Sequence, residues 1–352
     1  MAVTQRDIAE RVGVSVNTVS LVLRGAEAPL VSDGTRERVV EVARELGYRP
    51  NPHATALAGG HAPLIKICSE PKGTYVADRK AAALIQALRG LDREVTFGES
   101  IPRHDPEAAV QQLAWGSPQA VVFPELGGPM ETIVPLAEGL HDEGIYMLVA
   151  DLHLDADLDD DVPCDTVRFD RAGAVRRAVE HLLQLGHRQI ALVTFDRYHG
   201  RQEGYTSALQ AAGINESHIA RISIPQSVAG TFDHNVYFAR QASEHIRRLF
   251  SEHRDITGLV CRTDMASLGV MTTLREMGID VPGDVSIVSF RNDPWTEFMD
   301  VPLTTMAEPV EEACKICREL IGARFEGDKG PWRREILEYQ LIERASTAPA
   351  TG

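Results

Sequence analysis

Short apolar runs alternate with helical patterns through residues 63–345, and this rhythm restricts the possible folds more than any other feature of the chain. The runs are LIKIC, EVTF, AVVF, YMLVA, QIALV, GLVC and VSIVSF. Strands that are apolar on both faces and separated by helices form parallel sheets with helices on both sides. The sequence therefore predicts an α/β body, which a polar stretch, DLHLDADLDDDVPC, divides into two blocks.

The first 50 residues have a purely helical pattern. A capping-box-like start at Thr4 opens a first helix, which Gly13 ends. Ser15 can cap a second helix, and Ser32 opens a third. The second helix is expected to bury Val19, Val22 and Leu23 and to expose Val16, Asn17, Ser20 and Leu21. Two short helices about a glycine turn predict a helix-turn-helix, although a three-helix bundle without a ligand has the same periodicity.

A short alanine-rich segment follows the helical head. Asn51 is placed to cap it, Pro52 occupies its first helical position, and Gly59-Gly60 ends it. A helix of this length is not stable alone. We expect it to order only when DNA or a symmetry mate supports it.

Charge and composition restrict the function less than the motifs do. The chain of 352 residues has a net charge of −15, but residues 1–60 carry seven arginines and seven acidic residues, so the head is neutral. A neutral head lacks the basic bias of many DNA-binding domains and decides nothing by itself. The sequence has no signal peptide and no long apolar run, and its five cysteines fit free thiols in the cytoplasm.

Motifs for catalysis, cofactors and metals are absent from the sequence. It contains no P-loop, G-x-G-x-x-G, G-x-S-x-G or H-E-x-x-H pattern. The C-x-x-C pair Cys314 and Cys317 lies within a predicted helix, where buried thiols are expected. The acidic run of residues 155–161 lacks the glycine and glutamate of a calcium loop. We therefore expect no catalytic residue, no cofactor and no metal.

Several motifs in order resemble the LacI/GalR family of bacterial transcription regulators. They are VTQRDIAERVGVSVNTVSLVLRG, VSDGTRERVVEVARELGYRPN, ATALAGG, VEHLLQLGHRQIALV, GRQEGYTSALQAAG, CRTDMASLGV, VPGDVSIVSF, PLTTM and LIERAST. The resemblance implies a fold with an N-terminal all-α helix-turn-helix head, a hinge helix, and a periplasmic-binding-protein-like α/β body of two parallel-sheet subdomains.

The same resemblance implies domain limits. The head spans residues 1–50, the hinge helix and linker 51–62, the body 63–345, and a tail 346–352. Within the body, one subdomain comprises about 63–165 and 306–330, and the other about 166–290 and 331–345. Chain crossovers are expected near Asp165, Phe290 and Thr305.

The resemblance also implies DNA-binding roles. Many phosphate contacts in this family come from hydroxyls, amides and helix N-termini. Leu57 is the wedge that enters the minor groove, although it could also be an ordinary apolar linker residue. Many members have arginine at the base-reading position of Leu21, so leucine implies a changed operator preference. The expected DNA-binding residues are Thr4, Arg6, Ser15, Val16, Asn17, Thr18, Ser20, Leu21, Arg24, Arg49, Asn51, Ala54 and Leu57.

For the effector, the resemblance implies a pocket between the subdomains. Its expected residues are Tyr75, Asp151, Phe169, Arg201, Phe232, Thr263, Asp264 and Arg291. Arg291 stands where a sugar-binding aspartate is common, and two arginines suit an anionic ligand. Alternatively, Arg291 pairs with Asp151 or Asp264, or turns to solvent, which leaves a neutral effector or none.

We therefore interpret the chain as a cytoplasmic transcription regulator that acts as a repressor. The expected partners are double-stranded operator DNA, a second copy of the chain in a homodimer, and a small-molecule effector such as a sugar, sugar acid or sugar phosphate; no membrane is involved. Two alternatives of other classes are a small-molecule-binding protein whose head is an interaction module, and an enzyme.

Overall fold

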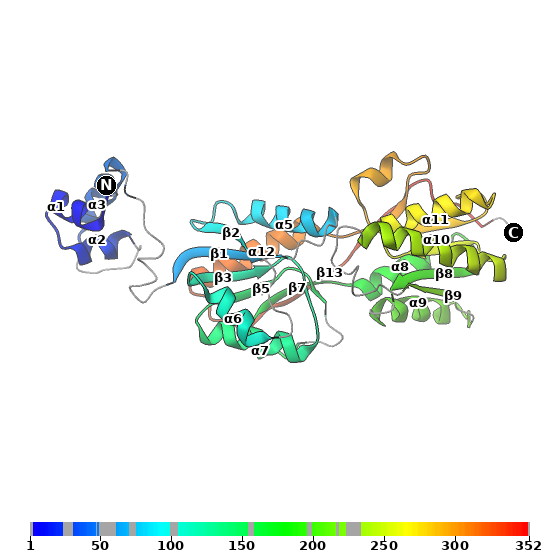
Figure 1. Ribbon diagram of the computed structural model, residues 1–352, viewed down its shortest axis with the longest axis horizontal. Coiled ribbons are helices and arrows are strands. Elements are labelled where there is room, and N and C mark those ends of the chain that lie inside the picture. The colour runs from blue at the N-terminus through cyan, green and yellow to red at the C-terminus, as the bar shows by residue number, and fades with distance from the viewer. Residues whose placement is uncertain are drawn as a thin grey trace. The chain divides into compact units, whose positions relative to one another are not determined.

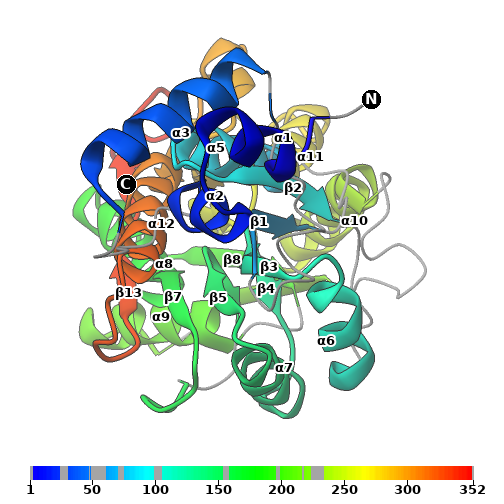
Figure 2. The same cartoon turned by 90° about the vertical axis from the view of Figure 1, so that its left-hand side faces the viewer.

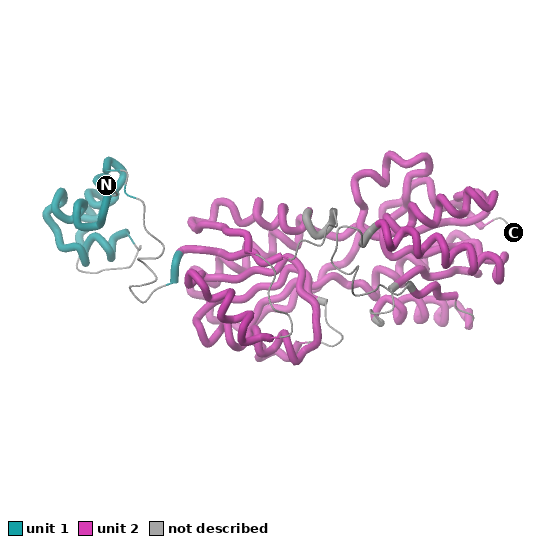
Figure 3. Tube along the Cα trace, in the orientation of Figure 1, with its two compact units in different colours: residues 1–62 teal, residues 63–352 magenta. Residues whose placement is uncertain are grey.

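The computed structural model describes residues 3–23, 31–46, 48, 61–69, 75–98, 105–153, 158–195, 199–215, 218–222 and 234–350. The chain separates into two units, residues 1–62 and residues 63–352 (Figure 3). Within the described ranges, no helix combines the length and the apolar character that a membrane span requires.

The described part of the head contains three helices around one small core (Figures 1 and 2). They are α1 (Gln5–Val12), α2 (Val16–Leu23) and α3 (Asp33–Glu45). The backbone N–H and the hydroxyl of Thr4 both donate to Asp7 Oδ2, at 2.7 and 2.8 Å, and Gly13 ends α1 with a φ of 80°. The buried core residues are Ile8, Ala9, Val19, Val22, Val39, Val42 and Ala43. The predicted burial of Val19 and Val22 is confirmed, and Leu23 packs against this core while partly exposed.

The first sheet of the body has the strand order β13-β7-β5-β3-β1-β2. Helices α5 and α12 cover one face and α6 and α7 cover the other (Figure 1). The strands are β1 (Ala62–Cys68), β2 (Glu94–Gly98), β3 (Pro118–Phe123), β5 (Tyr146–Val149), β7 (Asp165–Phe169) and β13 (Arg334–Leu337). The helices are α5 (Tyr75–Leu88), α6 (Pro106–Ala114), α7 (Met130–Asp142) and α12 (Val310–Phe325), and β4 (Leu126–Gly127) pairs with β6 (Leu152–His153) beside them.

The second sheet has the strand order β14-β12-β11-β10-β8-β9, with α8 and α9 on one face and α10 and α11 on the other. Its strands are β8 (Ile190–Phe195), β9 (His218–Ile222), β10 (Gly258–Cys261), β11 (Ser286–Arg291), β12 (Thr304–Ala307) and β14 (Gln340–Ile342). Its helices are α8 (Arg171–Gln184), α9 (His199–Ala211), α10 (His234–Glu252), α11 (Asp264–Glu276) and the 3₁₀ helix η1 (Pro294–Phe298). Only the β12–β14 ladder of the described strands is antiparallel.

The central strands are apolar on both faces because helices cover both. In β3, Ala120 and Val122 pack with α5 and α12, whereas Val121 and Phe123 pack with α6 and α7. The residues of the run QIALV in β8 likewise alternate between the cores on the two faces of the second sheet. All seven predicted strand runs are strands of the two sheets, which confirms the α/β prediction.

Three segments carry the chain between the two sheets, and they correct the expected subdomain limits. The crossings are at Asp170, between β7 and α8; at Glu308, between β12 and α12; and at Tyr339, between β13 and β14. Strand β7 belongs to the first sheet, and so does β13, because it pairs with β7 in parallel. The assignment of 166–169 and 331–337 to the second subdomain was therefore wrong, and so was that of 306–307 to the first, because β12 belongs to the second sheet. Phe290 lies inside β11 and is no crossover.

The expected tail is also wrong for residues 346–350, which pack on the second sheet. Ser346 is fully buried, and its carbonyl accepts from Ile287 N at 2.7 Å. Its hydroxyl donates to Ile287 O at 2.7 Å and accepts from Thr304 N at 2.8 Å. The segment therefore joins β11 and β12 through hydrogen bonds.

Helices α10 and α11 pack closely at Gly269, where a Cβ would lie 2.3 Å from the carbonyl oxygen of Ala239. Gly269→Ala should therefore lower the free energy of unfolding by about 2 kcal/mol or more, because the helices must separate. Gly322 in α12 has no atom within 4 Å of its Cβ position, so Gly322→Ala should stabilise by about 0.5 kcal/mol. Chemical denaturation of both variants measures this, and equal effects would contradict it.

Candidate DNA-binding face and effector site

Helix α2 presents its first turn to solvent while its valines hold the head together. Val16 is 43% exposed and Asn17 is exposed, whereas Val19 and Val22 are buried. Ser20 and Leu21, predicted to be exposed, are half-buried. The face that could meet a DNA groove is therefore narrower than the sequence indicated and lies mainly at the start of the helix.

Hydroxyl groups organise the N-terminus of α2. Ser15 Oγ accepts from the Thr18 backbone N–H at 3.0 Å and shares a 2.8 Å hydrogen bond with Thr18 Oγ1. The helix contains no charged residue, so its attraction for a phosphate comes from free backbone N–H groups at this end. Arg6 and Thr4 are exposed on the same head. The expected DNA contacts Arg24, Arg49, Asn51, Ala54 and Leu57 lie outside the described residues.

In the body, the buried carboxylate of Asp151 pairs with two positively charged side chains. Asp151 follows β5 and is fully buried. Its Oδ2 accepts from Lys80 Nζ at 2.6 Å, and its Oδ1 accepts from Arg171 Nη2 at 2.5 Å. Burial alone would lower the pKa of Lys80, but Asp151 and Glu308 outweigh it and raise that pKa, so the amine stays charged.

The same cluster includes residues from all three crossings. Arg171 follows the first crossing, Glu308 occupies the second and Tyr339 the third. Glu308 Oε2 lies 3.0 Å from Lys80 Nζ, and the Tyr339 hydroxyl donates to Glu308 Oε1 at 3.3 Å. Burial raises the pKa of Glu308, but the charge of Lys80 reverses this and holds it below the ordinary value. Residues that follow strands of both sheets, Asp151 after β5 and Glu308 after β12, therefore meet around Lys80.

Aromatic rings pack beside this charge cluster. Tyr339 makes edge-to-face contacts with Phe169 and Phe290, with ring centres 6.0 and 5.9 Å apart. Lys80 Nζ lies 5.0 Å from the Phe169 ring centre. The sequence predicted Phe169 and Asp151 but missed Lys80, Arg171, Glu308 and Tyr339. A lysine inside the apolar helix sequence KAAALIQAL was the available sign for the first of these.

Arg201 is a buried cation with no ion-pair partner in the part of the chain that the structure describes. It lies in the first turn of α9, is 5% exposed, and stacks over Phe290 with its guanidinium carbon 5.1 Å from the ring centre. Its Nε and Nη1 atoms donate no hydrogen bond within the described part of the chain. Burial lowers its pKa; Tyr339 and Glu308 oppose this, whereas the charges of Arg171 and Arg291 add to it. A buried cation without an acceptor is costly and suits a ligand that supplies one.

Arg291 ends β11 next to this group and is half-buried. It makes no ion pair with Asp151 or Asp264, the two partners considered from the sequence, nor with any other described residue. Its φ is 103° and that of Asn292 is 58°, both in the left-handed region. Non-glycine residues in such conformations are strained and persist only where the surrounding structure holds them. They are found most often at ligand-binding and active sites.

Thr263 and Asp264 hold the protein itself in shape. Thr263 Oγ1 caps α11 by accepting from Ala266 N at 3.1 Å. Asp264 Oδ1 accepts from the Ser289 hydroxyl at 2.5 Å, and Oδ2 accepts from Asp293 N at 2.7 Å. Both oxygens are thus bound by the chain, and they fix the turn that follows Arg291. Burial raises the pKa of Asp264 to about 7, against the lowering effect of these hydrogen bonds.

Other predicted residues contribute less information. The side chain of Tyr75 and all of Phe232 lie outside the described residues. All five cysteines are free, as predicted, and all are buried, which was predicted only for Cys314 and Cys317. Burial raises the pKa of Cys314 to about 11, as expected of inert thiols. Among the described side chains, no group of three or more His, Cys, Asp or Glu is placed to hold a metal ion.

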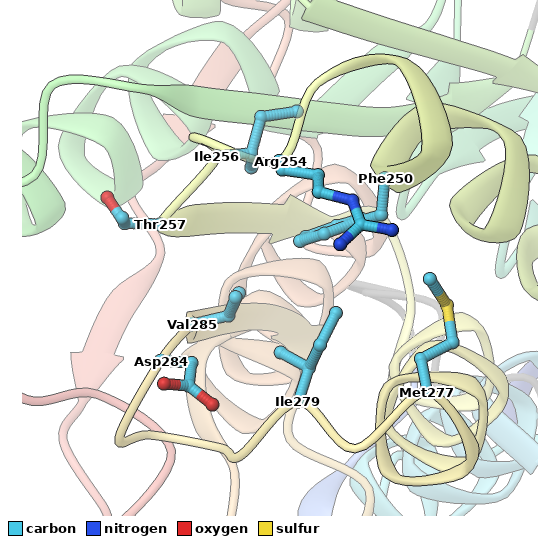
Figure 4. Close-up of a pocket in the computed structure, with 8 residues that line it drawn as sticks. All are labelled: Phe250, Arg254, Ile256, Thr257, Met277, Ile279, Asp284 and Val285. Atoms are coloured by element: carbon cyan, nitrogen blue, oxygen red, sulfur yellow. The ribbon is translucent and has the colours of Figure 1, made fainter.

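A separate pocket of about 400 Å³ opens at the other end of the second sheet (Figure 4). Thr257 and Val285, which line it, precede β10 and β11, whereas Arg201 and Arg291 lie near the carboxyl ends of strands. Ligands in open parallel sheets bind beyond the carboxyl ends. The charge cluster is therefore the better candidate for an effector site.

Comparison with known proteins identifies the family. A model of bacterial regulatory proteins of the lacI family matches residues 4–51, and a periplasmic binding protein-like domain model matches residues 179–347. An HTH-type transcriptional regulator in the aml 5′ region of Streptomyces limosus is 30% identical over 97% of this chain and 93% of that protein. The chain belongs to the LacI family.

Other LacI-family proteins match over nearly the full length. The transcriptional repressor CytR of Escherichia coli is 26% identical over 98% of this chain and 96% of its own. The lac repressor dimer bound to operator has a TM-score of 0.75 at 23% identity and covers 99% of this chain and 100% of that one. A LacI-family protein from Silicibacter pomeroyi has a TM-score of 0.68 at 26% identity, covering 98% and 99%. The chain is thus a DNA-binding transcription regulator with a ligand-binding body.

Asp264 makes the stability of this LacI-family body depend on pH. Because its pKa is raised on folding, its stabilising contribution is greatest at low pH and is lost as pH rises toward about 7. Asp264→Asn should remove this slope, so its stability relative to wild type should rise by about 2 kcal/mol from pH 5 to pH 7. Denaturation at several pH values, with the exposed Asp300→Asn as control, measures it. Parallel profiles of wild type and Asp264→Asn would contradict the assignment.

Proposed function

We propose that this LacI-family regulator is a homodimeric repressor that binds a two-fold symmetric operator through α2. Its affinity for the operator changes when a small molecule binds between the two subdomains of the body. It acts in the cytoplasm and by binding alone, without catalysis. The observation that carries the DNA part is the exposed first turn of α2, with Val16 and Asn17 facing solvent over a core that they do not support.

Exposed aromatic side chains support the homodimer. Phe97 on the edge strand β2 is 55% exposed, and Phe298 in η1 is 80% exposed. Both are large apolar side chains that a second copy could cover. Two heads in one dimer match a two-fold operator, since the symmetry of the protein and of the DNA must agree. The lac repressor was solved as a dimer on its operator.

The buried charges at the three crossings support control by an effector. A ligand there would touch segments of both subdomains and could change the angle between them. Two family members of similar fold were solved with sugars, CelR with cellobiose and an Enterococcus faecium regulator with ribose. We propose that the angle is passed to residues 51–62, with Leu57 as the wedge in the minor groove and Ala54 packing on the partner hinge.

Fluorescence anisotropy with labelled DNA from upstream of the gene itself tests the proposal. Wild type should bind one segment far more tightly than random DNA, and Leu57→Ala should weaken this at least tenfold, because the wedge no longer unstacks the central base step. Circular dichroism should show both proteins equally folded. Binding without sequence preference would favour the interaction-module alternative, and unchanged affinity of Leu57→Ala would remove the hinge assignment.

Leu21 should control which base is read. Leu21→Arg replaces an apolar contact with a guanidinium that can bind guanine through two hydrogen bonds, so the preferred base in each half-site should change. Val40→Arg adds the same charge on α3, where the valine is 41% exposed, and should raise general DNA affinity only. Selection from a random DNA pool measures both. The same consensus from wild type and Leu21→Arg would place Leu21 away from the bases.

A further inference from the structure

We infer that the effector is a hydroxylated organic anion, such as a uronate or an aldonate, whose acid group binds Arg201 and Arg291. This rests on the proposed function, because it takes the charge cluster at the crossings as the effector site. It goes further in naming the chemistry of the ligand. The inference depends on which charges in the cluster already have partners and which do not.

Three of the carboxylates near the two arginines already have partners of their own. Asp151 binds Lys80 and Arg171 through its two oxygens. Glu308 accepts from the Tyr339 hydroxyl through Oε1, and its Oε2 forms an ion pair with Lys80 without a hydrogen bond of good geometry. Asp264 binds Ser289 and the Asp293 backbone. Within the described residues, none of these carboxylates forms an ion pair with Arg201 or Arg291.

The two arginines therefore keep unused donors. Arg201 is buried, with Nε and Nη1 unbonded within the described residues, and its guanidinium stacks over Phe290, the residue directly before Arg291. A neutral sugar hydroxyl could accept from one of them, but it would leave the buried charge of Arg201 without a counter-ion in a region of low dielectric. A carboxylate or phosphate would neutralise the pair and accept two or more charge-assisted hydrogen bonds.

One acceptor nearby is unused as well. Asp293 is 7% exposed, and its Oδ1 accepts no hydrogen bond from the described residues. It follows Arg291 by two positions, and the positive charge of Arg291 acts on it. An oxygen that needs a donor beside cations that need acceptors matches a molecule with both a hydroxyl group and an acid group.

The turn at Arg291 is held by contacts that do not involve the Arg291 side chain. Asn292 Oδ1 accepts from Arg344 Nη2 at 2.8 Å, and Asp264 accepts from Asp293 N at 2.7 Å. These contacts flank Arg291 on the C-terminal side and maintain two successive left-handed residues. The guanidinium is thereby placed without using its own hydrogen bonds.

Thermal unfolding of the full-length chain with matched acid and neutral probes tests the inference. The pairs are glucuronate with glucose and gluconate with sorbitol, at equal ionic strength. The acid of at least one pair should raise the Tm of wild type more than its neutral counterpart does. Arg201→Gln and Arg291→Gln should each weaken that effect at least tenfold in ligand concentration. Arg275→Gln, an exposed arginine of α11, is the matched control and should respond as wild type does.

Two results would overturn the inference. One is stabilisation by the neutral probes equal to that by the acids. The other is an acid response that persists unchanged in Arg201→Gln and Arg291→Gln. If no probe binds, the Tm of the ligand-free variants at low salt tests the inference. Arg291→Gln should unfold at a higher temperature than Arg275→Gln, because repulsion from Arg201 is removed. An equal or lower Tm of Arg291→Gln refutes the inference. Operator binding by α2 variants is measured separately, so a failure here leaves the DNA-binding proposal standing.

Discussion

The arrangement of the body depends on one buried carboxylate, that of Asp151. Two charges from the first subdomain, Asp151 and Lys80, bind Arg171 and Glu308, which stand at two of the crossings, and Tyr339 adds the third. Asp151 and Lys80 each have two partners of opposite charge, and breaking such a buried pair by removing one side chain typically costs about 3–5 kcal/mol. The cluster therefore fixes where the chain passes between the sheets, and the subdomains can move only about these points.

This constraint explains how the binding of a ligand in the body could affect the binding of DNA by the head. The apolar core is continuous from the first sheet through Phe169, Phe290 and Tyr339 to the second sheet, so a change of angle must repack side chains at the crossings. A packed core of this kind adopts discrete arrangements, and a ligand selects one of them. Strand β1 begins at Ala62, directly after the segment that joins the head to the body. Any rotation of the first subdomain is therefore transmitted to that segment by the covalent chain.

The sequence predicted the central strands well, because a strand buried on both faces has to be apolar at every position. It failed at β13, where the burial pattern is half-exposed and the pairing with β7 joins residues far apart in the chain. It also failed for Ser346, whose small polar side chain gives no sign of burial, and for Lys80, which is buried only because Asp151 and Glu308 lie beside it. In each case the position of the residue depends on partners far away in the sequence, and the local sequence pattern carries no information about them.

Arg291 and Leu21, the contact residues proposed for the effector and for the operator, are alike in one respect: the structure that supports each of them does not involve its side chain. The turn after Arg291 is held by Asp264 and Arg344, and α2 is held by Val19 and Val22, so neither support depends on the variable side chain. A scaffold whose hydrogen bonds and core are satisfied without the contact residue can accept a new charge or shape there at little cost in stability. Specificity for the operator and for the effector can consequently change independently of the fold, and of each other.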